Sequence, residues 1–549
     1  MKNFFIYFLS ITFIGQIQSI ELPIIEYQSI NHPVIGDQGM VVSQRMIASE
    51  VGASILRQGG NAVDAAVATG LALAVVLPRA GNIGGGGFMV FRKNDGEIGA
   101  LDFREKAPLS ASENMYLDKN GDIIEKLSEE GALSCGVPGT IAGIFSVHER
   151  FGSLEINRLF RQAIEICTKG FKVSTELHQS LKNHEETLKI QDSGKELYPS
   201  GRAPDVGDTI QRTLLAKTLE SISFKGPDYF YKGEVNEAIS EALLNIITKD
   251  DISSFNSQWI EPLSIEMYGK IGWVTPPHTQ SYLTLATLKI YEILDGDSKD
   301  IDLHTLIESY RAAASQRDDI TYDYGNNIGL FPGLNTEYLK SLSNLIDLDN
   351  SSKFDQPSDI GGGTAYMCTK DNEGNAVSLF QSNYYGIGST IGVGDYGFFL
   401  HNRGAGFNLS HNHPNSLKPG RKPLHTLSPT MWSVDGNLDM IIGSRGGRYQ
   451  PQLLSHFILK ILKNENLENA MTSPRWNIDE FGKKSLSEIN IEPGLDKKII
   501  EELINKGHKV NQLAELQNSY GPISAIVKTE DNWKASHDLR VDTSSSIIE

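Results

Sequence analysis

The sequence predicts a globular α+β protein, and three stretches carry this prediction. Residues 61–76 are apolar nearly all round, which is typical of a helix buried at the centre of a fold. Residues 364–370 and 376–383 are strand-like runs joined by a turn at 371–375, where Asn and Gly tolerate the backbone angles of a tight turn. The glycine run 84–87 leads into a further apolar strand. We therefore expect helices and strands in one chain.

Composition and charge exclude one class of partner. The chain has 549 residues, of which 40% are hydrophobic and 21% charged, as expected for a soluble and well-packed protein. Its net charge of −18 opposes binding to a phosphate backbone. We expect a small-molecule substrate and no nucleic-acid partner.

The first residues resemble an export signal. Lys2 gives a positive start, residues 4–15 are apolar, and residues 16–19 are polar or small. The run is too short to span a membrane, which takes about 20 apolar residues. A buried first helix or a retained anchor is the alternative. We expect residues 1–19 to be removed near Ser19, with an exported, periplasmic or extracellular protein that has no membrane span.

Three cysteines, Cys135, Cys167 and Cys368, are too few for a disulfide framework. A single bridge is possible, but three buried thiols are the simpler expectation. Cys368 has a second interpretation as a catalytic thiol. Because it lies within a predicted strand and has no evident His partner, we assign it to the core.

The first third of the chain alternates helices with glycine-rich turns. We expect a helix over 43–58, ended by the glycines at 59 and 60, and a second helix capped by Asn61 with Asp64 in its first turn. The run 84–87 lacks the Gly-Lys-Ser/Thr ending of a phosphate loop and precedes a strand, so it predicts close backbone packing. Arg104 follows a strand and either pairs with a neighbouring carboxylate or binds a substrate carboxylate.

The middle of the chain contains few residues that suggest catalysis or ligand binding. Residues 135–330 are expected to be mainly helical, with a kinked loop at 274–280 that approaches the surface. Residues 334–360 are polar and predict a flexible lead-in to the hairpin. A mobile segment there would suit a chain that is cut just beyond it.

Thr364 opens a strand directly after three glycines. An ordinary hairpin explains this pattern. The functional alternative is a cut between Gly363 and Thr364, after which the new α-amino group of Thr364 would activate its own hydroxyl as a nucleophile.

Two features of the last third allow competing interpretations. His401, His411, His413 and His425 could suggest a metal, but their irregular spacing favours loop hydrogen bonding, and we predict no metal or cofactor. Gly446 and Gly447 precede a helix and offer either a simple turn or the N–H groups of an oxyanion hole.

Taken together, these segments resemble the gamma-glutamyltranspeptidase family of N-terminal-nucleophile hydrolases. The resemblance runs over most of the chain, on Thr364 and on residues 59–68, 80–88, 102–108, 136–140, 374–377, 427–430 and 443–447. It implies a four-layer αββα sandwich and a precursor that cuts itself. The products would be a large subunit of residues 20–363 and a small subunit of residues 364–549, intertwined in one catalytic unit.

The resemblance also implies site residues. Thr364 matches the nucleophile, and Gly446 and Gly447 match the oxyanion hole. Arg104 matches the arginine that binds the glutamyl α-carboxylate, and Asn383 matches a site asparagine. Ser382, or Gln381 in a shifted register, lies near the hydroxyl beside the nucleophile.

The substrate-binding positions depart from the family. Arg403 and Gly406 replace the Gln and Asp that bind the α-amino group, and His425–Thr426 replaces a Ser pair at the carboxylate. The short separation of Gly406 and His425 predicts a short or absent lid loop, as in acylase-like relatives. An arginine in place of ammonium ligands favours an acyl group that carries only a carboxylate.

Three functions therefore remain at this point. One is a γ-glutamyl (glutathione-like) amide hydrolase with possible acyl transfer to an amine. The second is a glutaryl- or cephalosporin-type acylase, and the third is an inactive binding protein on the same scaffold.

Overall fold

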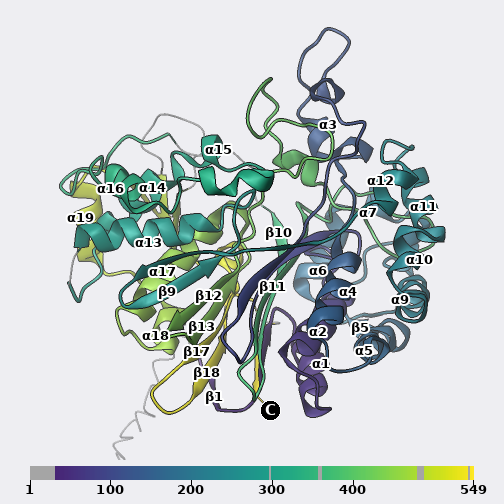
Figure 1. The fold of residues 1–549 in the computed structure, drawn as a ribbon, viewed down its shortest axis with the longest axis horizontal. Coiled ribbons are helices and arrows are strands. Elements are labelled where there is room, and N and C mark those ends of the chain that lie inside the picture. Colours follow the sequence, from purple (N-terminus) through teal and green to yellow (C-terminus); the bar gives the residue numbers. More distant parts are fainter. Residues whose placement is uncertain (1–30, 296–297, 356–361, 479–487, 542–543, 549) are drawn as a thin grey trace, which may run out of the picture.

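The computed structural model describes residues 31–295, 298–355, 362–478, 488–541 and 544–548. Two seven-stranded antiparallel sheets face each other, and helices cover both outer faces (Figure 1). This arrangement confirms the α+β class and the four-layer αββα sandwich.

One sheet carries the predicted hairpin at its centre. Its order is β19 (Ser545–Ile548), β2 (Met40–Ser43), β10 (Gly363–Lys370), β11 (Ala376–Tyr384), β3 (Gly86–Arg92), β4 (Ile98–Phe103) and β7 (Gln258–Ile260). Met367 pairs with Leu379 on one side and with Ser43 on the other. Strands from before and after residue 364 therefore pair with one another in one hydrogen-bonded sheet.

The second sheet collects strands from both ends of the chain. Its order is β1 (Val34–Gly36), β18 (Trp533–His537), β17 (Ile523–Lys528), β13 (Asn437–Ser444), β12 (Thr430–Val434), β9 (Lys270–Val274) and β8 (Leu263–Met267). Strands β7, β8 and β9 fall in the region expected to be mainly helical. They are at most five residues long, and their half-exposed residues gave a weak strand pattern.

Apolar side chains from the two inner faces form the layer between the sheets. Phe88 and Phe380 come from one sheet, and Met431 and Ile441 from the other. Cys368 belongs to this layer. All three cysteines are buried free thiols, as expected. Burial raises the pKa of Cys135 to about 12 and raises that of Cys368 as well, which keeps both thiols protonated.

Helices α1 (Met46–Arg57) and α2 (Ala62–Val76) cover the first sheet. α1 begins later than expected because Ser43 ends strand β2. Asn61 caps α2 in a reciprocal capping box with Asp64, and all of α2 is buried, as its sequence predicts. The other helices on this side are α3 (Lys126–Glu129), α4 (Thr140–Phe151), α5 (Ile156–Lys169), α6 (Thr175–Asn183), α7 (Glu185–Leu188), α8 (Asp192–Lys195), α9 (Thr213–Lys225), α10 (Pro227–Tyr231), α11 (Glu234–Ala242) and α12 (Lys249–Ser253).

A second helical layer covers the other sheet. It contains α13 (Tyr282–Asp295), α14 (Leu303–Ala314), α15 (Arg317–Ile320), α16 (Thr336–Ser343), α17 (Gln450–Leu462), α18 (Leu467–Thr472) and α19 (Lys497–Asn505). Two small sheets complete the fold, one from β14 (Trp476–Ile478), β15 (Glu488–Ile491) and β16 (Lys509–Gln512), the other from β5 (Phe171–Lys172) and β6 (Thr209–Ile210).

Two local expectations are wrong. The segment expected to be a flexible lead-in contains helix α16, which Asn335 caps and which buries Leu339 and Leu342 against the core. Residues 356–360 of that segment lie outside the described residues. The loop at 274–280 is buried rather than near the surface, and His278 binds the Pro423 carbonyl and the carboxylate of Asp102 on β4.

The expected export signal also lies outside the described residues, which begin at residue 31. Within the described part of the chain, no helix has the length and apolar character needed to cross a membrane.

Candidate active site

Thr364 lies at an irregular point in the pairing of β10 with β11. Gly363 pairs with Tyr384 and Ala365 with Gln381, so the two residues Ser382 and Asn383 lie opposite Thr364 alone. Such bulges redirect side chains and are common beside active sites. Thr364 is buried in the centre of the sheet, next to the proposed cut.

The hydroxyl of Ser382 contacts the bond that would be cut. Its Oγ donates to the Gly363 carbonyl over 2.7 Å and accepts from the Tyr384 N–H over 2.9 Å. Since the second contact fixes the orientation of the hydroxyl, its proton points at the carbonyl oxygen. This contact favours Ser382 over Gln381, whose amide instead donates to the Gly70 carbonyl.

Gly446 and Gly447 form the turn between β13 and α17. Both have positive φ, 131° and 55°, which a residue with a side chain rarely adopts. Neither N–H group makes a hydrogen bond to another residue in the described part of the chain. Gln280 holds this turn, donating to the carbonyls of Gly447 and Thr426 over 3.3 Å. Sequence analysis did not assign a role to Gln280.

Asn383 binds backbone rather than an open pocket. Its Oδ1 accepts from the Asn82 N–H over 3.1 Å, and its Nδ2 donates to the Phe399 carbonyl over 3.3 Å. The glycine run next to it packs closely on β11, as predicted, because a Cβ on Gly87 would lie 1.9 Å from the Phe380 carbonyl oxygen. Asn383 thus holds the segment that contains the glycine run against β11, the strand that pairs with Thr364's strand β10.

Arg104 is fully buried and pairs with Glu105, not with the side chain of Asp102. Its Nη2 lies 2.6 Å from Glu105 Oε1, and its Nη1 donates to the carbonyls of Gly86 and Ser382. Burial lowers the pKa of Arg104 to about 10, so the guanidinium stays charged at neutral pH. Asp102 instead binds His278 and Lys422.

Arg403 and Gly406 depend on each other. The Arg403 guanidinium lies 3.9 Å from the centre of the Tyr384 ring and donates to the Leu424 carbonyl. A Cβ on Gly406 would lie 2.5 Å from that same carbonyl oxygen and 3.0 Å from Arg403 Nε. A side chain at 406 would therefore displace the arginine.

His425 is buried between positive charges, with its Nε2 3.6 Å from Glu105 Oε2. Burial lowers the pKa of His425 well below its ordinary value, and Arg104 and Arg403 lower it further. His401 lies on the other side of the Glu105 carboxylate at 3.9 Å. The structure thus gathers Arg104, Glu105, Arg403 and His425, while Thr426 contributes its backbone carbonyl to Gln280.

Tyr384 and its neighbour separate two pockets. Tyr384 and Arg403 line a pocket of about 370 Å³, together with Gly406 and Leu424. Tyr385, Gly363 and Gly446 line a second pocket of about 590 Å³. The two pockets share no lining residue, and Thr364 itself lines neither of them.

The second pocket contains three charged residues that sequence analysis missed. Glu176, on α6, pairs with Arg79 at 2.7 Å and also with Arg445. Burial alone would raise the pKa of Glu176, but Arg445 and Arg79 together lower it to about 2. Arg445 had appeared only as part of a glycine-rich motif.

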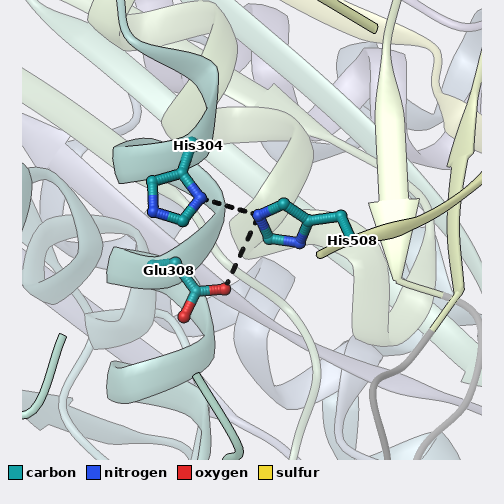
Figure 2. A group of neighbouring side chains, drawn as sticks. All are labelled: His304, Glu308 and His508. Carbon is teal, nitrogen blue, oxygen red and sulfur yellow. Dashed lines mark hydrogen bonds and ion pairs between the residues drawn. The ribbon is translucent and has the colours of Figure 1, made fainter. Parts of the chain in front are cut away.

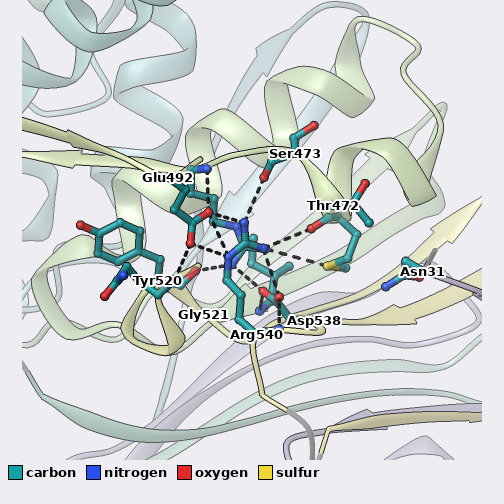
Figure 3. Close-up of polar contacts among 12 residues, drawn as sticks. Asn31, Thr472, Ser473, Glu492, Tyr520, Gly521, Asp538 and Arg540 are labelled. Carbon is teal, nitrogen blue, oxygen red and sulfur yellow. Dashed lines mark hydrogen bonds and ion pairs between the residues drawn. The ribbon is translucent and has the colours of Figure 1, made fainter. Parts of the chain in front are cut away.

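A buried ion network holds the loop at one wall of this pocket (Figure 3). Asp538 pairs with Arg475 and Arg540, and Glu492 also pairs with Arg540. Arg475 donates to the Tyr520 carbonyl, and Arg445 Nε donates to the Gly521 carbonyl over 2.8 Å. The network thereby fixes the loop that presents Asn518 and Ser519 to the pocket.

The histidines considered for a metal do not gather in one place. His411 is exposed and pairs with Glu113, whereas His401 and His425 are buried beside Glu105. A different group, His304, Glu308 and His508, has donor atoms close together (Figure 2). There His304 Nδ1 lies 2.7 Å from His508 Nε2, and Glu308 pairs with Arg311. Hydrogen bonds and ion pairs thus already engage these donor atoms.

Comparison with known proteins gives consistent matches. A profile of the family described as Gamma-glutamyltranspeptidase matches residues 48–548. The glutathione hydrolase proenzyme of Escherichia coli (strain K12) is 32% identical over 535 residues, covering 92% of this chain and 90% of that protein. That of Pseudomonas sp. (strain A14) is 33% identical over 491 residues, covering 81% and 82%. The crystal structure of cephalosporin acylase from Bacillus halodurans superposes with a TM-score of 0.85 at 26% identity, covering 95% of this chain and 98% of that chain.

Proposed function

This chain belongs to the gamma-glutamyltranspeptidase family, and we propose that it is a self-processing amidohydrolase that acts on a γ-glutamyl or related acyl amide. The observation that carries the proposal is the Ser382 hydroxyl, which donates to the carbonyl of the residue before Thr364. Family membership supports hydrolysis over the inactive binding protein. The relatives named as proenzymes support processing into two chains.

The hydrogen bond from Ser382 to the Gly363 carbonyl supports this position for the cut. The Thr364 hydroxyl attacks the Gly363 carbonyl carbon, and Ser382 stabilises the oxyanion that develops on the carbonyl oxygen. The Gly363–Thr364 C–N bond breaks, the freed amine takes up the hydroxyl proton, and an ester links Gly363 to Thr364 Oγ. Water hydrolyses the ester, leaving a Gly363 carboxylate and an N-terminal Thr364.

The mature site uses the freed amine as its base. An α-amino group has an ordinary pKa of about 7.7–8.0, so a useful fraction is neutral near pH 7. It accepts the Thr364 hydroxyl proton as the oxygen attacks the substrate amide, and the amine product leaves as an acyl-enzyme forms. The N–H groups of Gly446 and Gly447 bind the oxyanion, each typically worth about 3 kcal/mol. Water resolves the ester, or an amine takes the acyl group.

The charges near Arg403 determine which acyl groups the site should bind. Arg104 and Arg403 lie beside the carboxylate of Glu105, and these two positive charges favour a carboxylate on the acyl chain. Gly406 itself offers no acidic partner for an ammonium and makes room for the arginine, but Glu125 and Asp318 line the same pocket, so both a γ-glutamyl and a glutaryl-type acyl group should bind. We assign export to the first 19 residues on the sequence pattern alone.

Two measurements test this function. On a denaturing gel, the purified protein should appear as two fragments whose boundary lies between Gly363 and Thr364. A single full-length band would contradict self-cleavage. Turnover of γ-glutamyl and glutaryl 4-nitroanilides should then be detectable. Much faster γ-glutamyl turnover would show that the site recognises the ammonium as well as the carboxylate, and would leave amide hydrolysis intact.

A further inference from the structure

The turn that carries the proposed oxyanion-hole glycines has no side chains to fix it. The carbonyls of Gly446 and Gly447 accept from the Tyr449 and Gln450 N–H groups, and these hydrogen bonds stay within the turn itself. Two adjacent glycines leave the backbone a wide choice of angles. An N–H group stabilises an oxyanion only when it points at the position that the oxygen will take. A contact from outside the turn is therefore needed to set the direction of these N–H groups.

Gln280 supplies such a contact from the part of the chain before the proposed cut. Its Nε2 donates to the carbonyls of Gly447 and Thr426 over 3.3 Å, and its backbone N–H donates to the His425 carbonyl over 2.9 Å. Gln280 is only 1% exposed, so water competes little for these contacts. One buried residue thus joins the turn to the loop at 425–426 and to the other side of the cut.

Arg317 determines which way the Gln280 amide faces. Its Nη1 donates to Gln280 Oε1 over 2.9 Å, and its Nε and Nη2 both donate to Asp318 Oδ1. A guanidinium only donates and a backbone carbonyl only accepts, so Gln280 must direct its oxygen at Arg317 and its NH2 group at the two carbonyls. Without Arg317, the amide could rotate and place its oxygen against those carbonyls, which would repel it.

Arg317 also belongs to the wall of the acyl pocket, the pocket of about 370 Å³ that Tyr384 and Arg403 line. Its side chain is almost fully buried there and is held by Gln280 and Asp318. The acyl pocket and the turn at Gly446 are therefore linked by two buried side chains in series, Arg317 and Gln280.

We propose that Gln280 and Arg317 are positioning residues that fix the oxyanion hole and link it to the acyl pocket. The inference rests on the proposed function. Because the oxyanion forms only as the reaction proceeds, loss of this positioning should lower kcat and leave KM unchanged. Self-cleavage should proceed normally, since there Ser382 contacts the reacting carbonyl.

Variants of Gln280 test the contact with the turn, with a glutaryl 4-nitroanilide as substrate. Loss of a whole oxyanion donor typically costs about 10²- to 10³-fold in kcat. Gln280→Met keeps the length of the side chain and removes its hydrogen bonds, so it should lower kcat by about tenfold at unchanged KM. Gln280→Glu keeps the contact with Arg317 but brings a carboxylate against the two carbonyls, and it should lower kcat at least as much.

Variants of Arg317 test the orientation of the amide. Arg317→Met should lower kcat at unchanged KM, and Arg317→Lys, which still donates to Gln280, should restore most of the loss. Gln452→Met is the matched control, because Gln452 is also a buried glutamine, with its Oε1 accepting from the Ile478 N–H over 2.9 Å. It should keep the native kcat and KM.

The alternatives give different results. An unchanged kcat in Gln280→Met would overturn the proposal, and so would a loss of self-cleavage together with hydrolysis, which indicates a general structural role. A rise in KM without a fall in kcat in Arg317→Met would assign Arg317 to acyl binding and overturn its positioning role.

Hydrogen–deuterium exchange decides the proposal if the native protein does not hydrolyse the anilide, in which case the proposed function fails. The Tyr449 and Gln450 N–H groups, which bind the carbonyls of the turn, should exchange about tenfold faster in Gln280→Met than in native protein. Exchange over α2 is the internal reference and should not change. Equal exchange at Tyr449 and Gln450 in the two proteins would overturn the positioning role.

Discussion

The two proposed sides of Thr364 hold the same kinds of charged group in different settings. On the proposed acyl side, Arg104 pairs with Glu105 and lies near Arg403, and both arginines are almost fully buried; on the other side, Arg79 and Arg445 pair with Glu176 at the wall of a larger pocket. Burial strengthens each interaction and fixes its geometry, whereas exposure weakens it and permits variation. We therefore expect the proposed acyl side to select strictly among substrates, and the cluster at Glu176 to affect rates by smaller factors.

The largest effect should come from the residue between the two sides. Thr364→Ala removes the attacking hydroxyl, so both self-cleavage and amide hydrolysis should be lost, as measured by gel and by anilide turnover. Thr364→Ser, which keeps a hydroxyl, should retain both at a reduced rate. A Thr364→Ala protein that still yields two fragments would show that another group makes the cut.

Ser382→Ala should slow self-cleavage by about 10²- to 10³-fold, because the Gly363 carbonyl loses its side-chain donor. The time course of precursor loss after rapid purification measures this rate. Ser378→Ala, on the same strand and also buried, is the matched control and should process at the native rate. Equal rates in Ser382→Ala and native protein would remove Ser382 from the mechanism.

On the acyl side, Arg403→Gln should lower kcat/KM for a glutaryl anilide by about 100-fold, since a buried charge-assisted contact to the carboxylate is lost. A γ-glutamyl anilide should lose less, because its ammonium no longer meets the arginine. The ratio of the two substrates is the measured quantity, and normal self-cleavage verifies the fold. An unchanged ratio would show that Arg403 does not determine which acyl group the enzyme prefers.

The smallest effects should appear in the pH dependence of stability, measured by urea unfolding of the uncut Thr364→Ala protein. The pKa of His425 is well below 6.5 in the folded protein, so below pH 6.5 only the unfolded state takes up this proton and stability falls. Each such group changes the free energy of unfolding by at most about 1.4 kcal/mol per pH unit. His425→Gln should therefore reduce the slope between pH 6.5 and 5.

Glu176 should respond in a different pH window. Its folded pKa of about 2 lies below its ordinary value of 4.5, so its stabilisation is complete above pH 4.5 and is lost as the pH falls towards 2. Glu176→Gln should lower stability without changing the slope between pH 6.5 and 5. A changed slope there would show that the two sides are electrostatically coupled.

Local signals in the sequence predicted much of the fold, including the hairpin and the glycine run that form the candidate site. The cap at Asn61, the turn at 371–375 and the close packing of the glycine run all depend on neighbouring residues, and all are present. Strands β7 to β9 were missed because they are short and partly exposed. Helix α16 was missed because its polar residues outnumber its two buried leucines.

Contacts over long distances in sequence could not be predicted in this way. Glu176 meets Arg79 across 97 positions and Arg445 across 269, and no local pattern indicates that the three meet. At Arg403 and Gly406 the change of charge was visible in the sequence. The structure adds that position 406 must be glycine to leave room for Arg403. The Arg403 guanidinium and a Cβ at position 406 would both lie against the Leu424 carbonyl.

The pairing of strands from before and after residue 364 in the first sheet affects how the protein refolds after heating. β2, from before the cut, lies between β19 and β10, from after it. A cut at Gly363 leaves this sheet intact, but once heat separates the strands, two chains must find each other again in solution, and the β10–β11 hairpin exposes its edges to aggregation. We therefore expect the uncut chain to refold after heating more completely than the two-chain form.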